Sequence, residues 1–255
     1  MNSRERLLCA IDRKIPDRVP VSTYELVGYN SRAFENNDPS YARLMQVIRE
    51  KTDCLCMWEP GSDAILPKSD HVGDFLETTS HPAELDVRRN VTDQFVETFS
   101  TLHTPQGPLK RATKVFNNVH TVWKTEHWCK GPDDVDRILA IPYRPVTYDF
   151  SDLPRIQGEV GDRGLIMTSV FDALGWCVEL MELSRSLLWA MTETDHFARC
   201  VEIVHERVME NLRRMLDQQV VDFYRFAGRN TRRRPTWRRT CSAASSSLTS
   251  PKWSS

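Results

Sequence analysis

The chain has 255 residues, of which 40% are hydrophobic, and its formal net charge is −1 at neutral pH. This length is enough to bury a sizeable core. The sequence contains no run of eighteen apolar residues and begins with charged residues, so we expect neither a membrane-spanning helix nor a signal peptide. Seven cysteines at irregular spacing, with no CxxC pair, are typical of reduced thiols, and we therefore expect a cytoplasmic protein.

The first twenty-one residues, MNSRERLLCAIDRKIPDRVPV, predict a capped helix, a break and a strand. Ser3 can serve as the N-cap of the helix. Pro16 ends it, because proline has no backbone N–H and restricts the residue before it. Residues 19–24 then predict a first strand, with Pro20 at its start or edge, where no ladder donor is needed.

The next segments alternate between helical and strand patterns. Asp38 and Pro39 predict the start of a helix that runs to about Lys51. Residues 53–58 form a short apolar run, as expected of a strand buried on both faces in a parallel sheet. Residues 72–128 instead predict an antiparallel insertion, in which strand-like segments at 95–99 and 119–123 are separated by a turn at 104–108.

The second half returns to the alternating pattern. Residues 130–134 predict the start of a helix, with acidic residues at its positive end. Strands are predicted at 164–170 and 220–226, with helices near 174–191 and 194–218 between them. In the second of these helices, one apolar stripe consists of Phe197, Val201, Val204, Val208, Leu212 and Met215. Such alternation indicates a parallel sheet or barrel, with about four or five strands before Gly228.

The opening pattern SRERLL-x-A-I-x-R-K-x-PDRVPV resembles the start of the uroporphyrinogen decarboxylase superfamily. That group contains the porphyrinogen decarboxylases and the corrinoid-dependent methyltransferases. The resemblance implies a (β/α)8 barrel. We therefore expect an α/β protein, an incomplete (β/α)8 TIM barrel with an antiparallel β insertion near residues 72–128.

Residues 229–255 differ in composition from the rest of the chain. They contain six Arg, one Lys and no acidic residue, whereas residues 1–228 carry a charge of −8, from 27 Lys and Arg against 35 Asp and Glu. A one-base shift in plausible GC-rich codons from Gly228 turns the tail into a proline-rich turn that resembles the family's G-x-E-x-x-x-PP-x-x-x-P-x-x-F segment. We therefore expect residues 1–228 to form a partial barrel domain and residues 229–255 to be a frameshifted, disordered end. The alternative is a native basic tail that binds nucleic acid or an anionic membrane.

Active sites of (β/α)8 barrels lie at the carboxyl ends of the strands. This rule selects three candidate catalytic residues, Glu25, Glu59 and Asp172, and three candidate substrate-binding residues, Tyr24, Trp58 and Arg225. Each has a structural alternative. The two glutamates could be solvated loop acids or helix caps, and Asp172 could cap the helix that follows it. An arginine within an apolar strand needs an acidic partner or an anionic ligand.

We expect no metal site in this chain. His120, His127 and Cys129 lie close in sequence but lack a fourth ligand and a standard zinc spacing. Cys54 and Cys56 share one strand face, where buried cysteines usually behave as small apolar residues.

The resemblance disfavours porphyrinogen decarboxylation. In the decarboxylases, a segment like W-x-M-R-Q-A-G-R-Y supplies arginines that meet the substrate carboxylates. Glu25 and Tyr29 stand at those positions here, and Glu59 and Pro60 follow the second strand where an aspartate would be expected. An acid facing a polycarboxylate is repulsive in a low-dielectric pocket.

The methyltransferase branch binds zinc through an H-x-C motif and a later cysteine, and zinc activates a substrate thiol toward a methyl-corrinoid. This chain contains no H-x-C. We therefore expect a parent enzyme that transfers methyl groups with zinc, a corrinoid and a corrinoid protein, and a 255-residue chain that holds no cofactor and is inactive. The alternatives are a uroporphyrinogen decarboxylase and a non-enzymatic protein with a nucleic-acid-binding tail. We expect a small-molecule substrate, no membrane partner and no nucleic-acid partner.

Overall fold

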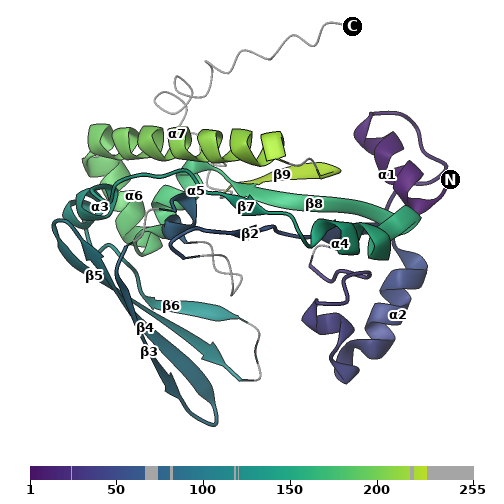
Figure 1. Ribbon diagram of the computed structural model, residues 1–255, viewed down its shortest axis with the longest axis horizontal. Coiled ribbons are helices and arrows are strands. Elements are labelled where there is room, and N and C mark those ends of the chain that lie inside the picture. Colours follow the sequence, from purple (N-terminus) through teal and green to yellow (C-terminus); the bar gives the residue numbers. More distant parts are fainter. Residues whose placement is uncertain are drawn as a thin grey trace, which may run out of the picture.

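The computed structural model describes residues 1–23, 25–66, 74–80, 83–117, 119, 121–218 and 221–228. It has a mixed α/β architecture with a three-stranded parallel sheet, a four-stranded antiparallel sheet and a two-stranded antiparallel ribbon (Figure 1). Tyr24, His120 and the predicted tail at 229–255 lie outside the described residues.

Seven α-helices lie in the described part of the chain. They are α1 (Ser3–Ile11), α2 (Ala42–Lys51), α3 (Pro132–Leu139), α4 (Leu153–Val160), α5 (Ala173–Glu179), α6 (Leu183–Thr192) and α7 (Thr194–Gln218). The described residues also form four short 3-10 helices: η1 (Phe34–Asn36), η2 (Pro39–Tyr41), η3 (Phe75–Thr78) and η4 (Gly161–Arg163).

The strands of the described residues are β1 (Cys54–Met57), β2 (Gly61–Ser62), β3 (Leu85–Val91), β4 (Phe95–Thr104), β5 (Gly107–Phe116), β6 (Val122–Glu126), β7 (Tyr148–Asp149), β8 (Gly164–Phe171) and β9 (Phe223–Ala227). The parallel sheet has the order β1-β8-β9, and the antiparallel sheet has the order β3-β4-β5-β6. The ribbon pairs β2 with β7.

The parallel sheet contains three strands, fewer than the four or five predicted, and the described residues form no closed barrel. Residues 19–23 do not form the predicted strand. They lie beside β1, where the N–H of Asp53 donates to the carbonyl of Val21 at 2.7 Å and the N–H of Leu55 donates to Oγ of Ser22 at 3.1 Å. Pro20 cannot donate and a side-chain oxygen replaces a backbone acceptor, so no regular ladder forms.

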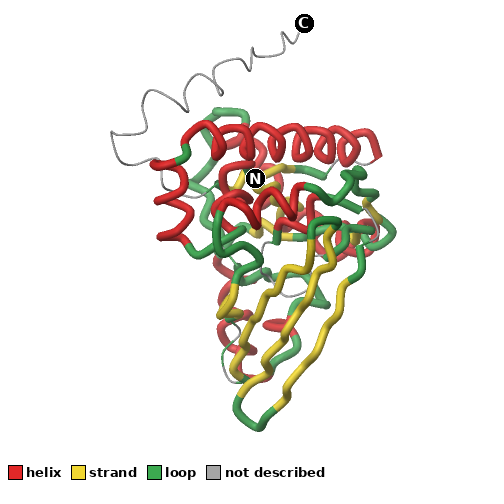
Figure 2. The backbone as a smooth tube through the Cα atoms, turned by 90° about the vertical axis from the view of Figure 1, so that its left-hand side faces the viewer, coloured by secondary structure: helices red, strands yellow, loops and turns green. Residues whose placement is uncertain are grey.

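The antiparallel insertion is confirmed, but the bounds of the strand predicted at 119–123 are wrong, because Val119 and Thr121 lie in no strand and β6 begins at Val122. β4 and β5 form a long hairpin whose ladder runs from Phe95 opposite Phe116 to Thr104 opposite Gly107, which places the turn within the predicted residues 104–108. Figure 2 shows this sheet as an arm that extends away from the helices. Strand β3 was not predicted, because its sequence LDVRRNV is mostly polar and shows no clear apolar alternation. In the structure, this strand is almost entirely exposed.

Helix α7 has the predicted bounds. Phe197, Val201, Val204 and Val208 of the predicted stripe pack in the larger core cluster, and Leu212 and Met215 are also buried. Val204 is fully buried, and Phe197 packs edge-on against Trp189 of α6 with ring centroids 4.8 Å apart. The single helix predicted near 174–191 is instead two helices, α5 and α6. The second begins where the carboxylate of Glu182 accepts a hydrogen bond from the N–H of Ser184.

Helix α1 is capped by Asn2 and not by the predicted Ser3. The side chain of Asn2 accepts from the N–H of Glu5, and the Glu5 carboxylate accepts from the N–H of Asn2, which completes a capping box. Arg4 of this helix pairs with Asp222, which precedes β9, and Arg6 pairs with Asp53, which precedes β1. The helix therefore lies at the amino ends of the parallel strands.

Within the described residues, we find no helix with both the length and the apolar composition of a membrane span.

Candidate functional site

A cavity of about 90 Å³ lies at the carboxyl ends of β1 and β8. Its polar lining residues are Glu59, Ser62, Glu77, Thr78, Tyr148, Ser169 and Asn211. Its larger apolar lining residues are Val170, Phe171, Trp176, Val208, Leu212 and Met215. Since α1 lies at the amino ends of the same strands, the cavity occupies the opposite end of the sheet.

Glu59 is the acid that the sheet itself positions. The N–H of Trp58 donates to the carbonyl of Met167 at 2.9 Å, which continues the pairing of β1 with β8 and carries Glu59 past the end of the strand. Its Oε1 atom then accepts a hydrogen bond from the N–H of Ser169 at 3.1 Å. The half-buried carboxylate is therefore held at the mouth of the sheet by a backbone donor.

Tyr148 brings a phenol to the same cavity from β7. Burial raises its pKa well above the usual value, and the neighbouring charges of Glu59 and Glu77 add to this effect. Tyr148 is consequently a neutral hydrogen-bond donor at physiological pH. Glu77 comes from η3, where its side chain also accepts from the N–H of Asp74 at 2.9 Å.

Asn211 fixes α7 to the wall of the cavity. Its Nδ2 atom donates to the carbonyl of Thr78 at 2.8 Å, and its Oδ1 atom accepts from the N–H of Val146 at 2.9 Å. Both ends of this buried amide are thus bound by backbone groups, one from η3 and one from the loop before β7. We interpret Asn211 as a positioning residue for the lining of the cavity.

The structure places Glu59 and Arg225 on either side of one residue. Arg225 lies opposite Ser169 in the β8–β9 ladder, and Ser169 is the residue whose N–H binds Glu59. Arg225 is not a lining residue of the cavity, and its predicted role in substrate binding stays a prediction. Trp58 is not a lining residue of the cavity. It is buried in the smaller core cluster, and its indole N–H donates to Asp152 at 3.4 Å.

Asp172 caps the helix that follows it, which was the structural alternative for this residue. Its Oδ1 atom accepts from the N–H of Gly175 at 2.6 Å at the start of α5. Gly228 packs closely against the same carboxylate. A Cβ atom at this position would lie 2.1 Å from Oδ2 of Asp172, so a larger residue would not fit here without a shift. A catalytic role for Asp172 stays a prediction.

Glu25 is exposed and is not a lining residue of the cavity. It lies in the loop that precedes Val27, and the predicted proximity of Glu25 to Glu59 stays a prediction. Tyr24, the other predicted residue of this loop, lies outside the described residues.

Five of the polar lining residues were missed from sequence: Ser62, Glu77, Thr78, Tyr148 and Asn211. Tyr148 lies on a two-residue strand that is too short to give a periodic pattern. Asn211 could have been found, because it falls on the buried face of α7, three positions after Val208 and four before Met215. A polar residue within an apolar stripe usually has buried hydrogen-bond partners.

The chemistry of the cavity is acidic and hydrogen bonding. The lining residues that the structure describes include carboxylates, a phenol, an amide and hydroxyl groups, but no lysine, arginine, histidine or cysteine. They therefore suit a small polar or cationic molecule better than a polyanion. They offer neither thiolate nor imidazole, so they do not fit the zinc that the resemblance implies.

We find no match to this chain among protein-family models, curated proteins or solved structures. The resemblance of the first twenty-one residues to the uroporphyrinogen decarboxylase superfamily therefore stays a prediction.

Proposed function

We propose that the chain is part of a (β/α)8 barrel enzyme of the uroporphyrinogen decarboxylase superfamily that binds a small molecule at the carboxyl ends of its parallel strands. The observation that carries this proposal is the position of Glu59. It follows β1 directly, accepts from the backbone of Ser169 on β8, and lines the cavity at the end of the sheet where barrel enzymes place their chemistry.

Methyl transfer is our preferred reaction for the parent enzyme. Two acids, Glu59 and Glu77, line the cavity, and its described lining has no basic residue. A substrate with many carboxylates would lose hydration on entry and meet like charges. A neutral or cationic methyl acceptor avoids this cost, and the carboxylate of Glu59 together with the phenol of Tyr148 would orient it by hydrogen bonds.

The described residues of the cavity include neither the histidine nor the cysteine through which the methyltransferases bind zinc. We therefore assign no step of the reaction to zinc or to the corrinoid. Zinc ligands of the parent would have to come from a continuation of the barrel, which the frameshift hypothesis places beyond Gly228.

The test starts from the DNA downstream of codon 228. We expect a one-base correction to open a frame that encodes the proline-rich turn, further strands and an H-x-C motif. The 255-residue and frame-restored proteins would then be compared for methyl transfer from methylcobalamin to a thiol in the presence of zinc, and for uroporphyrinogen decarboxylation. We expect methyl transfer by the restored protein alone.

Glu59→Gln in the restored protein should lower turnover, because the carboxylate lies at the cavity mouth. Glu50→Gln is the matched control, since Glu50 is an exposed acid of α2 whose side chain accepts from Gln46. A downstream sequence with no open frame, or decarboxylation without methyl transfer, would contradict this assignment.

A further inference from the structure

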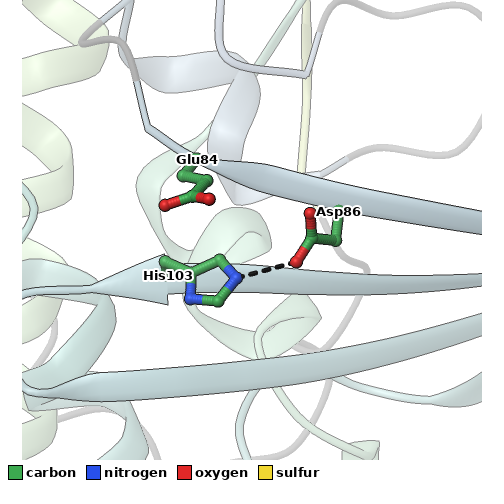
Figure 3. Close-up of side chains that lie close together, drawn as sticks. All are labelled: Glu84, Asp86 and His103. Atoms are coloured by element: carbon green, nitrogen blue, oxygen red, sulfur yellow. Dashed lines mark hydrogen bonds and ion pairs between the residues drawn. The ribbon is translucent and has the colours of Figure 1, made fainter.

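The antiparallel sheet carries three metal-binding side chains on one face. Asp86 lies on β3 and Glu84 directly precedes that strand, so the two acids are two residues apart and point to the same side. The N–H of His103 on β4 donates to the carbonyl of Glu84 at 3.0 Å, which places His103 beside both acids. Figure 3 shows both carboxylates near the imidazole of His103, whose Nε2 atom is 2.9 Å from Oδ2 of Asp86.

We propose that Glu84, Asp86 and His103 bind a divalent transition-metal ion of the zinc class, with water completing its coordination. Each residue offers one ligand atom, and these atoms all lie within 4.8 Å of one another. One imidazole nitrogen and two carboxylate oxygens form a donor set that suits Zn²⁺, which binds three protein ligands and a water in open sites.

The backbone fixes the three positions before any ion binds. The β3–β4 ladder sets the separation of the strands, and only the side-chain rotamers remain to be adjusted. Metal–ligand distances of about 2.0–2.2 Å require ligand atoms roughly 3.3 Å apart in a tetrahedral site. The side chains of His103 and Asp86 are 42% and 70% exposed, so they can make this small adjustment without disturbing the core.

The arrangement differs from an ordinary pairing of histidine with acids. His196 on α7 also has two acidic neighbours, but Nε2 faces Asp136 at 2.9 Å whereas Nδ1 faces Glu193 at 3.6 Å. Those acids lie at opposite nitrogens of the ring, so they cannot share one ion with a single nitrogen. Among the described residues, the group whose ligand atoms converge in this way is Glu84, Asp86 and His103.

The site would join β3 to β4 next to the β4–β5 turn, because His103 directly precedes Thr104, the last residue of β4. The site shares no residue with the cavity at the parallel strands. It is also not the zinc site that the family resemblance implies, because that site is built from histidine and cysteine. We therefore assign it a structural role, in which the ion cross-links a largely exposed edge strand to its neighbour.

The experiment titrates the full 255-residue chain with Zn²⁺ by calorimetry and with Co²⁺ by absorption spectroscopy. We expect one Zn²⁺ per chain and Co²⁺ ligand-field bands without the charge-transfer bands that cysteine ligation would add. His103→Ala should weaken Zn²⁺ binding by about tenfold or more, which is at least the loss seen when supporting residues of metal sites are removed. Asp86→Asn should do the same.

His196→Ala is the matched control and should bind Zn²⁺ as tightly as the unmodified chain. Circular dichroism of each variant checks that it is folded. We expect these substitutions to leave the fold intact, because all three ligand residues are exposed. Absence of Zn²⁺ binding, affinity that His103→Ala leaves unchanged, or cysteine charge-transfer bands on Co²⁺ would each overturn the proposal.

Discussion

Arg6 donates a hydrogen bond from Nη1 to Oδ1 of Asp53 at 2.6 Å, and this pair joins the first helix to the residue that precedes β1. Both side chains are buried, and Asp53 has no exposed surface. Arg18 also donates to Oδ1 of Asp53 at 3.0 Å, and the N–H of Val21 donates to Oδ2 at 3.2 Å. The carboxylate of Asp53 therefore accepts hydrogen bonds from three residues of the N-terminal segment, Arg6, Arg18 and Val21.

Asp53→Ala should destabilise the protein strongly, because it leaves the buried guanidinium of Arg6 with fewer acceptors. Removing one partner of a buried ion pair typically costs about 3–5 kcal/mol of unfolding free energy. Urea unfolding would measure the loss. The matched control is Asp12→Ala, since Asp12 is exposed and pairs only with the exposed Lys14 among its described ion pairs. A similar small change in both variants would contradict the assigned role of Asp53.

These contacts show the structural role of the charged residues in the first twenty-one positions. Its charged residues Arg4, Arg6, Asp17 and Arg18 make contacts at the amino ends of the parallel strands, the end opposite to the cavity. The local pattern could predict a helix followed by a break. It could not predict the position of Asp53, because that partner lies 47 residues from Arg6 and belongs to no local repeat.

Gly164→Ala should destabilise the parallel sheet. A Cβ atom at Gly164 would lie 2.1 Å from the carbonyl oxygen of Cys54 on the neighbouring strand, so β1 and β8 would have to separate. Overpacking of this kind typically costs about 1–3 kcal/mol. Gly158→Ala is the control, because a Cβ atom there meets nothing within 4 Å in helix α4. It should stabilise by about 0.5–1 kcal/mol, since alanine favours helix more than glycine.

Thermal unfolding of the two glycine variants would show opposite shifts. Equal shifts in the same direction would mean that the approach of β1 to β8 differs from the one described.

The helices show how far local sequence determines this fold. Helix α7 was predicted with its bounds because it combines a long apolar stripe with acidic and polar residues on its other faces. The break between α5 and α6 was missed because no proline or glycine marks it. Its N-cap is Glu182, and glutamate is not a usual capping residue. The cavity was predicted in part, since Glu59 follows an apolar run, whereas Tyr148 reaches it only through tertiary packing.

Glu159 should make the stability of the protein sensitive to acid. Hydrogen bonds from the hydroxyl and N–H groups of Ser31, followed by Arg155, lower the pKa of its carboxyl to about 2. The ordinary value for glutamate is about 4.3. A lowered folded-state pKa contributes stability above the unfolded value, and this contribution is lost as the pH falls from about 4.3 to about 2.

Melting temperatures measured between pH 7 and pH 2 would test this contribution. Glu159→Gln should lose less stability than the unmodified protein over the interval from about pH 4.3 to about pH 2. Glu50→Gln should follow the unmodified curve. Parallel curves for Glu159→Gln and the unmodified protein would show that the contacts of the Glu159 carboxylate with Ser31 and Arg155 do not stabilise the fold in solution.

Val204→Asp should unfold the region around α7. Val204 is fully buried in the larger core cluster, near the middle of the helix. An aspartate there would place an uncompensated charge in an apolar environment, at a cost of roughly 3–5 kcal/mol that is a large part of the stability of a typical domain.

Val47→Asp is the matched control, because Val47 lies on α2 with 48% of its surface exposed and should change stability by about 0.5 kcal/mol or less. Chemical unfolding followed by circular dichroism would separate the two variants. If Val204→Asp left the transition unchanged while Val47→Asp shifted it, the buried face of α7 would have to be reassigned, and with it the wall of the cavity that Val208, Asn211 and Met215 form.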